Sequence, residues 1–218
     1  DTGIDLSHST FLDDAGRSRV VAFWDQDGVA SSGPDGFDYG HLCDERAIQS
    51  STCTLVDPLG HGTHVAGIAA GLNGVAPAAD IAVVRSDSFT RVADAVLFLK
   101  ELADDRGQPL VVNLSVGGHY GAHDGRTALE EYLEQVVGPG VILVAAAGND
   151  GARSIHVGHD FSDETKRFGF TGIPWSKPSE VSVELWSAHS GDVKLALELW
   201  EDGQRKSSLS LSSSGDDY

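Results

Sequence analysis

LVVNL at residues 110–114 and VILVA at 141–145 are the two stretches that decide the fold of this 218-residue chain. Both are short and continuously apolar, as strands buried on both faces of a parallel sheet are. Between them, Thr127 followed by Glu130 forms a capping box that predicts a helix start, and Gly138-Pro139 predicts its end. A strand, a helix and a second strand in this order indicate a parallel α/β unit.

The same alternation extends back toward residue 19. Strands are predicted over 19–24 and 80–84, one helix begins at His61, and another covers 90–106. The stretch 29–58 is rich in Gly, Ser and Asp and is expected to be a long excursion. The first part of the chain is therefore expected to be an α/β domain whose parallel sheet carries helices on both faces.

In such sheets, ligands bind beyond the carboxyl ends of the strands. Gly117-Gly118 and Gly148-Asn149 come just after two of the predicted strands. A functional site is therefore expected at these positions.

After about residue 165 the hydrophobic period changes. Every second residue is apolar from Val181 to Leu185 and again from Val193 to Leu199. This alternation predicts antiparallel hairpins. We expect residues 1–150 to form one domain, 151–165 a connector, and 166–218 the start of an antiparallel β domain.

Composition limits the partners of the chain. Its 33 Asp and Glu against 15 Lys and Arg give a net charge of -18 and a sequence pI near 4.6. Such a field repels nucleic acids and anionic lipid surfaces, so neither is an expected partner. No apolar run approaches the ~20 residues that cross a bilayer, so no membrane span is expected.

The two cysteines, Cys43 and Cys53, lie ten positions apart in a polar stretch. A disulfide in an oxidising compartment and two free thiols both fit this spacing.

The Asp1-Thr-Gly triplet has two interpretations when taken alone. In aspartic proteases a D-T-G loop supplies one of two carboxylates that share a proton, but this chain holds no second D-T-G or D-S-G. An aspartate that caps a turn before glycine is the non-catalytic alternative.

The segment Gly60-His61-Gly-Thr-His64 places two histidines at the start of a predicted helix. A metal site would need a third ligand, and neither C-x-x-C nor H-E-x-x-H occurs, so no metal site is expected. The glycines beside His61 allow other backbone or a substrate to approach closely, which favours a functional role over local hydrogen bonding. For a second group of histidines we expect a role in hydrogen bonding, and not in metal binding. This group consists of His119, His123, His156 and His159.

Four segments occur in the order and setting of the subtilisin-like serine proteases, the subtilases: DTGID at 1–5, HGTHVAG at 61–67, VVNLSVGG at 111–118 and VAAAGND at 144–150. The resemblance covers about residues 1–150 and implies a subtilisin-like sheet, here with an incomplete core. Further features are similar to the clostridial germination-protease (Csp-like) branch: His8, Trp24-Asp-Gln26, Gly121–Gly125 and His156. That branch carries a jelly-roll insert after its oxyanion asparagine, and the hairpins predicted after residue 165 are similar to such an insert.

The resemblance implies three catalytic residues. Asp1 matches the aspartate that orients the imidazole, and His61 matches the general base. Asn149 matches the side-chain amide that donates a hydrogen bond to the developing oxyanion.

Two short segments are implied to bind a peptide or protein substrate. Ser115, Val116 and Gly117 match the edge that pairs with an extended peptide through main-chain hydrogen bonds. Ala146, Ala147 and Gly148 match the facing wall of the primary specificity pocket.

The chain departs from the family pattern at the nucleophile. The Gly-Thr-Ser-x-Ala-x-Pro segment is absent, and the serines between 207 and 214 follow a strand pattern. We therefore expect an inactive fragment of a serine endopeptidase that lacks the first core strand and the nucleophile. One alternative is an inactive relative that binds peptides or proteins. Another is a mature chain, paired with a second chain that carries the serine, in which an Asp1 ammonium would lie beside the Asp1 carboxylate.

Calcium is the cofactor that the family often binds, in an excursion after the histidine helix. Leu72-Asn-Gly-Val75 leaves almost no loop there, which argues against the usual site. The resemblance also implies a secreted, cell-envelope or spore-associated protein of bacterial type.

Overall fold

The computed structural model describes residues 1–29, 32–152, 186, 193–201 and 204–213. The chain divides into two compact units, Asp1–His119 with Gly125–Arg167 and Tyr120–Asp124 with Phe168–Tyr218. The described elements of the first unit are η1 (Ser9–Phe11), β1 (Val20–Asp25), β2 (His41–Asp44), α1 (Glu45–Gln49), α2 (His61–Ala70), β3 (Ile81–Arg85), η2 (Phe89–Arg91), α3 (Val92–Asp105), β4 (Leu110–Leu114), α4 (Ala128–Val136) and β5 (Val141–Ala145).

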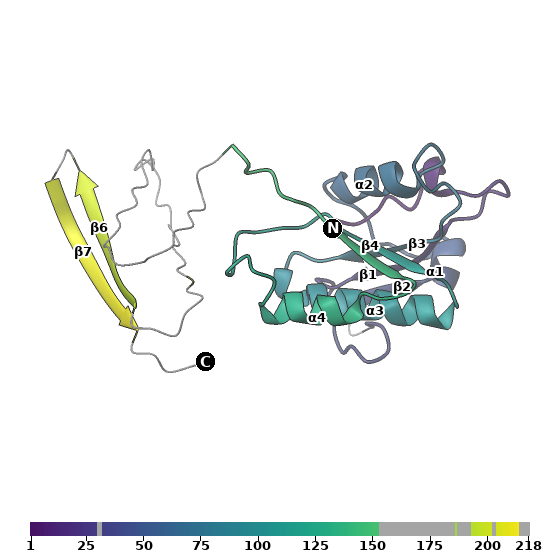
Figure 1. Ribbon diagram of the computed structural model, residues 1–218. Helices are drawn as coiled ribbons and strands as arrows, with labels where there is room; N and C mark the ends of the chain where they lie inside the picture. Colours follow the sequence, from purple (N-terminus) through teal and green to yellow (C-terminus); the bar gives the residue numbers. More distant parts are fainter. Residues whose placement is uncertain (30–31, 153–185, 187–192, 202–203, 214–218) are drawn as a thin grey trace. The chain divides into compact units, whose positions relative to one another are not determined.

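The first unit is the α/β arrangement that the sequence predicts. β1 pairs with β3 and β4 pairs with β5, both in parallel, while β2 lies antiparallel to the other edge of β1. Figure 1 shows α2 on one side of these strands and α3 and α4 on the other. β4 and β5 have the bounds expected from the sequence, and Thr127 caps α4 in the predicted capping box with Glu130.

Helix α3 packs against both sheets. Phe98 is buried with Ala22 and Trp24 of β1, whereas Val92 and Val96 are buried with Val112 of β4. Burial of a side chain such as Phe98 contributes about 1.5–3 kcal/mol to the free energy of unfolding. This one helix therefore fixes the two pairs of parallel strands within the same unit.

The two faces of the β4–β5 pair differ. Val112 faces the helices and is buried, whereas Val111 and Ile142 are register partners on the other face and are 66% and 57% exposed. Continuous apolar strands predict burial on both faces, and within the described residues only the face toward α3 and α4 is covered.

The 29–58 stretch contains two elements that its composition concealed, β2 and α1. Asp44 begins α1 by accepting a hydrogen bond from the Ala47 backbone at 2.7 Å. A disulfide joins Cys43 in β2 to Cys53, so of the two alternatives left open by the spacing the structure contains the bonded one.

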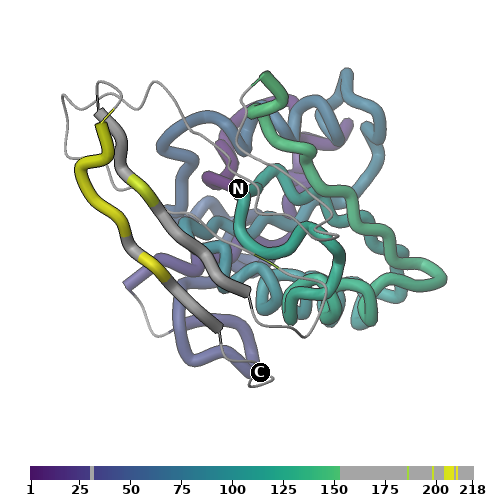
Figure 2. The backbone as a smooth tube through the Cα atoms, turned by 60° about the vertical axis from the view of Figure 1, so that its left-hand side comes forward, coloured from purple at the N-terminus to yellow at the C-terminus, as the bar shows by residue number. Residues whose placement is uncertain are grey.

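In the second unit, β6 (Val193–Glu201) and β7 (Gln204–Ser213) form an antiparallel hairpin. β6 covers the alternating run that begins at Val193, whereas the run from Val181 to Leu185 lies outside the described residues. The division at 151–165 and a jelly-roll-like insert over 166–218 stay predictions. Figure 2 shows the backbone as a tube, with a segment of β7 in yellow.

Candidate active site

Asp1 and His61 are 60 residues apart in sequence and in direct contact in the structure. Oδ1 of Asp1 lies 2.8 Å from Nδ1 of His61. The Asp1 side chain is 16% exposed, whereas the His61 side chain is 57% exposed. Oδ2 of Asp1 is buried and has no hydrogen-bond partner among the described residues. An aspartate held against one edge of an accessible imidazole can orient that ring and stabilise its charged form.

The glycines around His61 bring α2 close to the first residues of the chain. Gly60 adopts the left-handed conformation, with φ of 74°, immediately before the first helical residue. A Cβ atom on Gly62 would clash with the carbonyl oxygen of Gly3 and lie 3.0 Å from Oδ1 of Asp1. The sequence predicts that other backbone approaches the glycines beside His61. In the structure this backbone is the segment that carries Asp1.

The backbone of Asp1 lies beside the end of β3. Its nitrogen donates to the carbonyl oxygen of Val84 at 3.2 Å, and the nitrogen of Ser86 donates to the carbonyl oxygen of Asp1 at 3.3 Å. This alternation is that of a parallel ladder, so the carboxylate is carried at the carboxyl end of the sheet.

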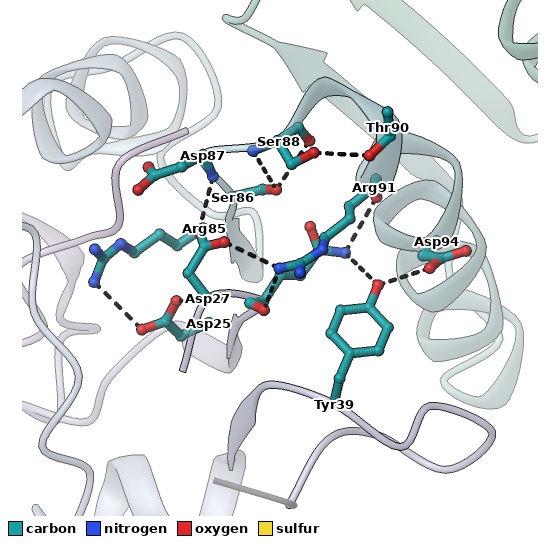
Figure 3. Close-up of polar contacts among 11 residues, drawn as sticks. Asp25, Asp27, Tyr39, Arg85, Ser86, Asp87, Ser88, Thr90, Arg91 and Asp94 are labelled. Atoms are coloured by element: carbon teal, nitrogen blue, oxygen red, sulfur yellow. Dashed lines mark hydrogen bonds and ion pairs between the residues drawn. The ribbon is translucent and has the colours of Figure 1, made fainter. Parts of the chain in front are cut away.

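A polar network fixes the segment that follows β3 (Figure 3). Arg91 donates to the carbonyl oxygen of Gln26 at 2.7 Å and to Asp27 at 3.0 Å, and Asp27 accepts from the backbone nitrogen of Asp87 at 2.8 Å. Arg85 pairs with Asp25 at 3.3 Å. The segment after β3, which forms a hydrogen bond with the backbone of Asp1, is thus held to the end of β1.

Tyr39 extends this network toward α3 (Figure 3). Its hydroxyl donates to Asp94 at 2.7 Å, and the Arg91 guanidinium lies 5.0 Å from the centre of its ring. Burial, followed by the Asp94 carboxylate, raises the pKa of the Tyr39 hydroxyl well above its ordinary value. Tyr39 therefore stays neutral and keeps its hydrogen bond to Asp94 throughout the physiological pH range.

Asp57 is a residue of this site that the sequence reasoning missed. It accepts hydrogen bonds from Thr2 at 2.7 Å and from both the backbone and the hydroxyl of Thr63, at 2.8 and 2.7 Å. Its position in the sequence could have indicated a role, because it lies four residues before His61 and just ahead of a helix start, where an aspartate often caps the helix.

The predicted substrate-binding residues follow β4 and β5 at the same end of that pair. The backbone nitrogen of Ala146 donates to the carbonyl oxygen of Leu114 at 3.0 Å, and beyond this bond lie the two predicted segments, 115–117 and 146–148. The Asn113 amide donates to the Ser115 hydroxyl at 2.8 Å.

Asn149 follows the second of these segments, and its side chain is exposed. In the described part of the chain no hydrogen bond joins it to Asp1 or His61. Next to it, Oδ2 of Asp150 lies 2.8 Å from Nε2 of His119, a bond between the chain after β5 and the chain after β4. His119 thus takes part in hydrogen bonding, the role favoured for its group, whereas His156 and His159 lie outside the described residues.

The structure describes no cluster of His, Cys, Asp or Glu side chains suited to a metal ion in the residues that it places. After α2 the chain turns at once: Gly74 N donates to the carbonyl oxygen of Gly71 at 2.8 Å, and Ala76 N donates to that of Ala69 at 2.8 Å. Calcium needs six to eight oxygen ligands, and this tight turn does not fit a calcium loop.

Among the described helices, none is long and apolar enough to cross a membrane.

Comparison with known proteins gives the family. Residues 1–183 match the subtilase family. Subtilisin E of Bacillus subtilis is 31% identical over 180 residues, which are 77% of this chain and 41% of that protein. Subtilisin-like protease 3 of Pseudogymnoascus destructans is 37% identical over 107 residues, which are 45% of this chain and 25% of that protein.

A solved structure, that of the Clostridium perfringens CspB protease, is also similar. It superposes with a TM-score of 0.60 and 31% identity over 69% of this chain and 35% of that chain. The chain thus spans less than half the length of these relatives. The resemblance inferred from the four motifs, including that to the Csp-like branch, is confirmed. The chain belongs to the subtilase family of serine-type peptidases.

Proposed function

We propose that this chain is part of a subtilisin-like serine endopeptidase, with Asp1 and His61 as two members of its catalytic triad and Asn149 as its oxyanion donor. The observation that carries the proposal is the 2.8 Å contact between Oδ1 of Asp1 and Nδ1 of His61. Membership of the subtilase family and the exposed imidazole support it. The nucleophilic serine would come from a part of the protein other than the residues of this chain.

The contact defines the working edge of the imidazole. A carboxylate oxygen can only accept a hydrogen bond, so Nδ1 of His61 carries the ring proton and donates a hydrogen bond to Asp1. Nε2 is then the basic nitrogen, because a neutral imidazole has one donor and one acceptor. His61 can therefore take the serine proton on Nε2 while Asp1 stabilises the imidazolium that forms.

The reaction then follows from the positions of the protons. As the serine oxygen bonds to the scissile carbonyl carbon, its proton passes to Nε2 of His61 and the carbonyl oxygen gains the negative charge. The Asn149 amide donates a hydrogen bond to that oxyanion. The imidazolium returns the proton to the leaving amine as the C–N bond breaks, and a water molecule then releases the acyl group by the same route.

The segments 115–117 and 146–148 would hold the substrate on either side. The backbone after β4 offers donors and acceptors to an extended peptide, which would add to it as a further strand. Ala146, Ala147 and Gly148 bring little side-chain volume, so the facing wall leaves room for a large apolar substrate side chain.

A location outside the reducing cytosol agrees with this function. The Cys43–Cys53 disulfide is typical of a protein in an oxidising compartment. The net charge of -18 favours solubility. We propose a secreted, cell-envelope or spore-associated enzyme.

Peptide hydrolysis by the purified full-length protein tests the proposal. The wild type is expected to cleave unstructured polypeptides, and the His61→Ala variant to lose turnover by about a million-fold, the loss typical of removing a triad histidine. If wild type and variant both bind peptides without cleaving them, the proposal is wrong and the protein is an inactive, peptide-binding relative.

A further inference from the structure

Asp57 accepts an unusual number of hydrogen bonds from separate segments of the chain. Its Oδ1 accepts from the Thr2 hydroxyl at 2.7 Å, the Gly60 backbone at 2.9 Å and the Leu59 backbone at 3.2 Å. Its Oδ2 accepts from the backbone and the hydroxyl of Thr63 at 2.8 and 2.7 Å. One carboxylate thus binds the loop that begins the chain, the turn before α2 and the first turn of α2.

These bonds lie on both sides of the Asp1–His61 pair. Thr2 follows Asp1, and its backbone nitrogen donates to Oδ1 of Asp1 at 2.7 Å. The Thr2 hydroxyl, which donates to Asp57, also accepts from the Gly62 backbone at 3.0 Å, and Gly62 follows His61. Movement of either partner away from the other would break at least one of these bonds.

The segment that carries Asp57 is itself packed against the chain near Asp1. A Cβ atom on Gly3, whose φ is 126°, would lie 2.7 Å from the carbonyl oxygen of Val56. The Thr63 hydroxyl donates to Asp57 and accepts from the backbone nitrogen of Asp5 at 2.9 Å. Three segments therefore meet at Asp57 with little free space between them.

We infer that Asp57 is a positioning residue, which acts with Thr2 to set the distance and angle between Asp1 and His61. The effect on catalysis rests on the proposed function. The effect on the geometry of the Asp1–His61 contact does not depend on it. The hydrogen bonds of Asp57 go to Thr2 and to the start of α2, and among the described residues none goes to the side chains of Asp1 or His61, so its effect passes through these partners.

An amide cannot replace this carboxylate. Both oxygens of Asp57 accept hydrogen bonds, whereas asparagine offers one acceptor oxygen and an NH₂ group that donates. In Asp57→Asn, either Thr2 or the Thr63 backbone would face a donor. The variant keeps the size of the side chain and leaves one acceptor oxygen in place of two.

Kinetics of the full-length protein distinguish positioning from simple capping of a helix. Asp57→Asn and Thr2→Val are expected to lower kcat by about 10- to 100-fold with little change in KM, since a displaced general base slows the chemical step. Thr2→Ser keeps the hydroxyl and is expected to restore the rate. The matched control is Asp44→Asn, because Asp44 caps α1 through Ala47. The inference is wrong if kcat of Asp57→Asn equals that of Asp44→Asn and kcat of Thr2→Val equals that of Thr2→Ser.

Nuclear magnetic resonance of the same proteins gives a reading that needs no activity. A proton held between Nδ1 of His61 and Asp1 gives a strongly downfield signal, which His61→Ala assigns. We expect this signal to be lost or shifted upfield in Asp57→Asn and Thr2→Val, and kept in Thr2→Ser and Asp44→Asn. Retention in the first two variants would overturn the inference even in a protein that cleaves nothing. If Asp57→Asn does not fold, Thr2→Val decides by the same two measurements.

Discussion

Gly62, the second residue of α2, lies directly against the carbonyl oxygen of Gly3, so that the helix and the segment bearing Asp1 meet without an intervening side chain. A methyl group at this position must push one of the two away. We expect Gly62→Ala to lower kcat/KM for peptide hydrolysis by about 100-fold or more, because a displacement near 1 Å at a reacting group has this effect. Steady-state kinetics of the full-length protein measure it.

Gly67 supplies the control for this change. It lies in the same helix, and among the residues that the structure describes a Cβ atom there would meet nothing within 4 Å. Gly67→Ala should leave kcat/KM unchanged and raise the free energy of unfolding by about 0.5–1 kcal/mol through better helix propensity. Equal activity of the two variants would show that the contact between Gly62 and Gly3 does not set the position of His61.

Asn149 is expected to act on the transition state and not on the bound substrate. Asn149→Ala should lower kcat by about 100- to 1,000-fold, the cost of losing one oxyanion donor, with KM nearly constant. Asn73→Ala, at an exposed position after α2, is the control. A rise in KM at constant kcat would instead assign Asn149 to substrate binding.

The acid stability of the protein should depend on Asp57. Burial alone raises the pKa of its carboxyl, but hydrogen bonds from Thr63, Thr2 and Gly60 outweigh that effect and lower the pKa to about 2. Because the folded pKa lies below the unfolded value of about 3.9, the ionised group stabilises the fold above about pH 4, and this contribution is lost as the pH falls toward 2.

Urea unfolding at a series of pH values checks this sign. The difference in free energy of unfolding between wild type and Asp57→Asn is expected to be constant above about pH 5 and to shrink as the pH falls to about 2. A difference that does not vary with pH would show that the hydrogen bonds to Asp57 do not require its charge.

The Cys43–Cys53 disulfide closes a short loop that contains α1. Its reduction should lower the free energy of unfolding by about 2–3 kcal/mol, since a loop of this length loses that much constraint in the unfolded chain. Denaturation with and without a reductant measures the change, and the double variant Cys43→Ala, Cys53→Ala should show no such dependence. An identical response of both proteins would mean that the bond stabilises nothing.

The parts of the fold that the sequence predicted best are those with strong local signals. β4 and β5 are continuous apolar runs, and the capping box of Thr127 with Glu130 marks the start of α4. β2 was missed because its four residues pair with β1 from a stretch whose composition is that of a loop. Such pairing is decided by the tertiary partner and not by the short segment itself.

The same limit applies to the candidate site. Asp1 and His61 stand in motifs whose neighbouring glycines indicate a close approach, so their meeting could be expected from sequence. The role of Asp57 could not, because its partners Thr2 and Thr63 come from two segments that become neighbours only after folding. An aspartate ahead of a helix predicts a cap and carries no sign of a bond to a residue 55 positions earlier.

The most direct measurement of the central claim is labelling of the full-length protein with a fluorophosphonate, followed by mass spectrometry of its peptides. Such a reagent reacts with a serine only where a base accepts the serine proton. We predict one labelled serine in the wild type, with labelling abolished in His61→Ala and strongly slowed in Asp1→Asn. An unlabelled wild type, or a serine labelled equally well without the imidazole, would contradict the assignment of Asp1 and His61 to a catalytic triad.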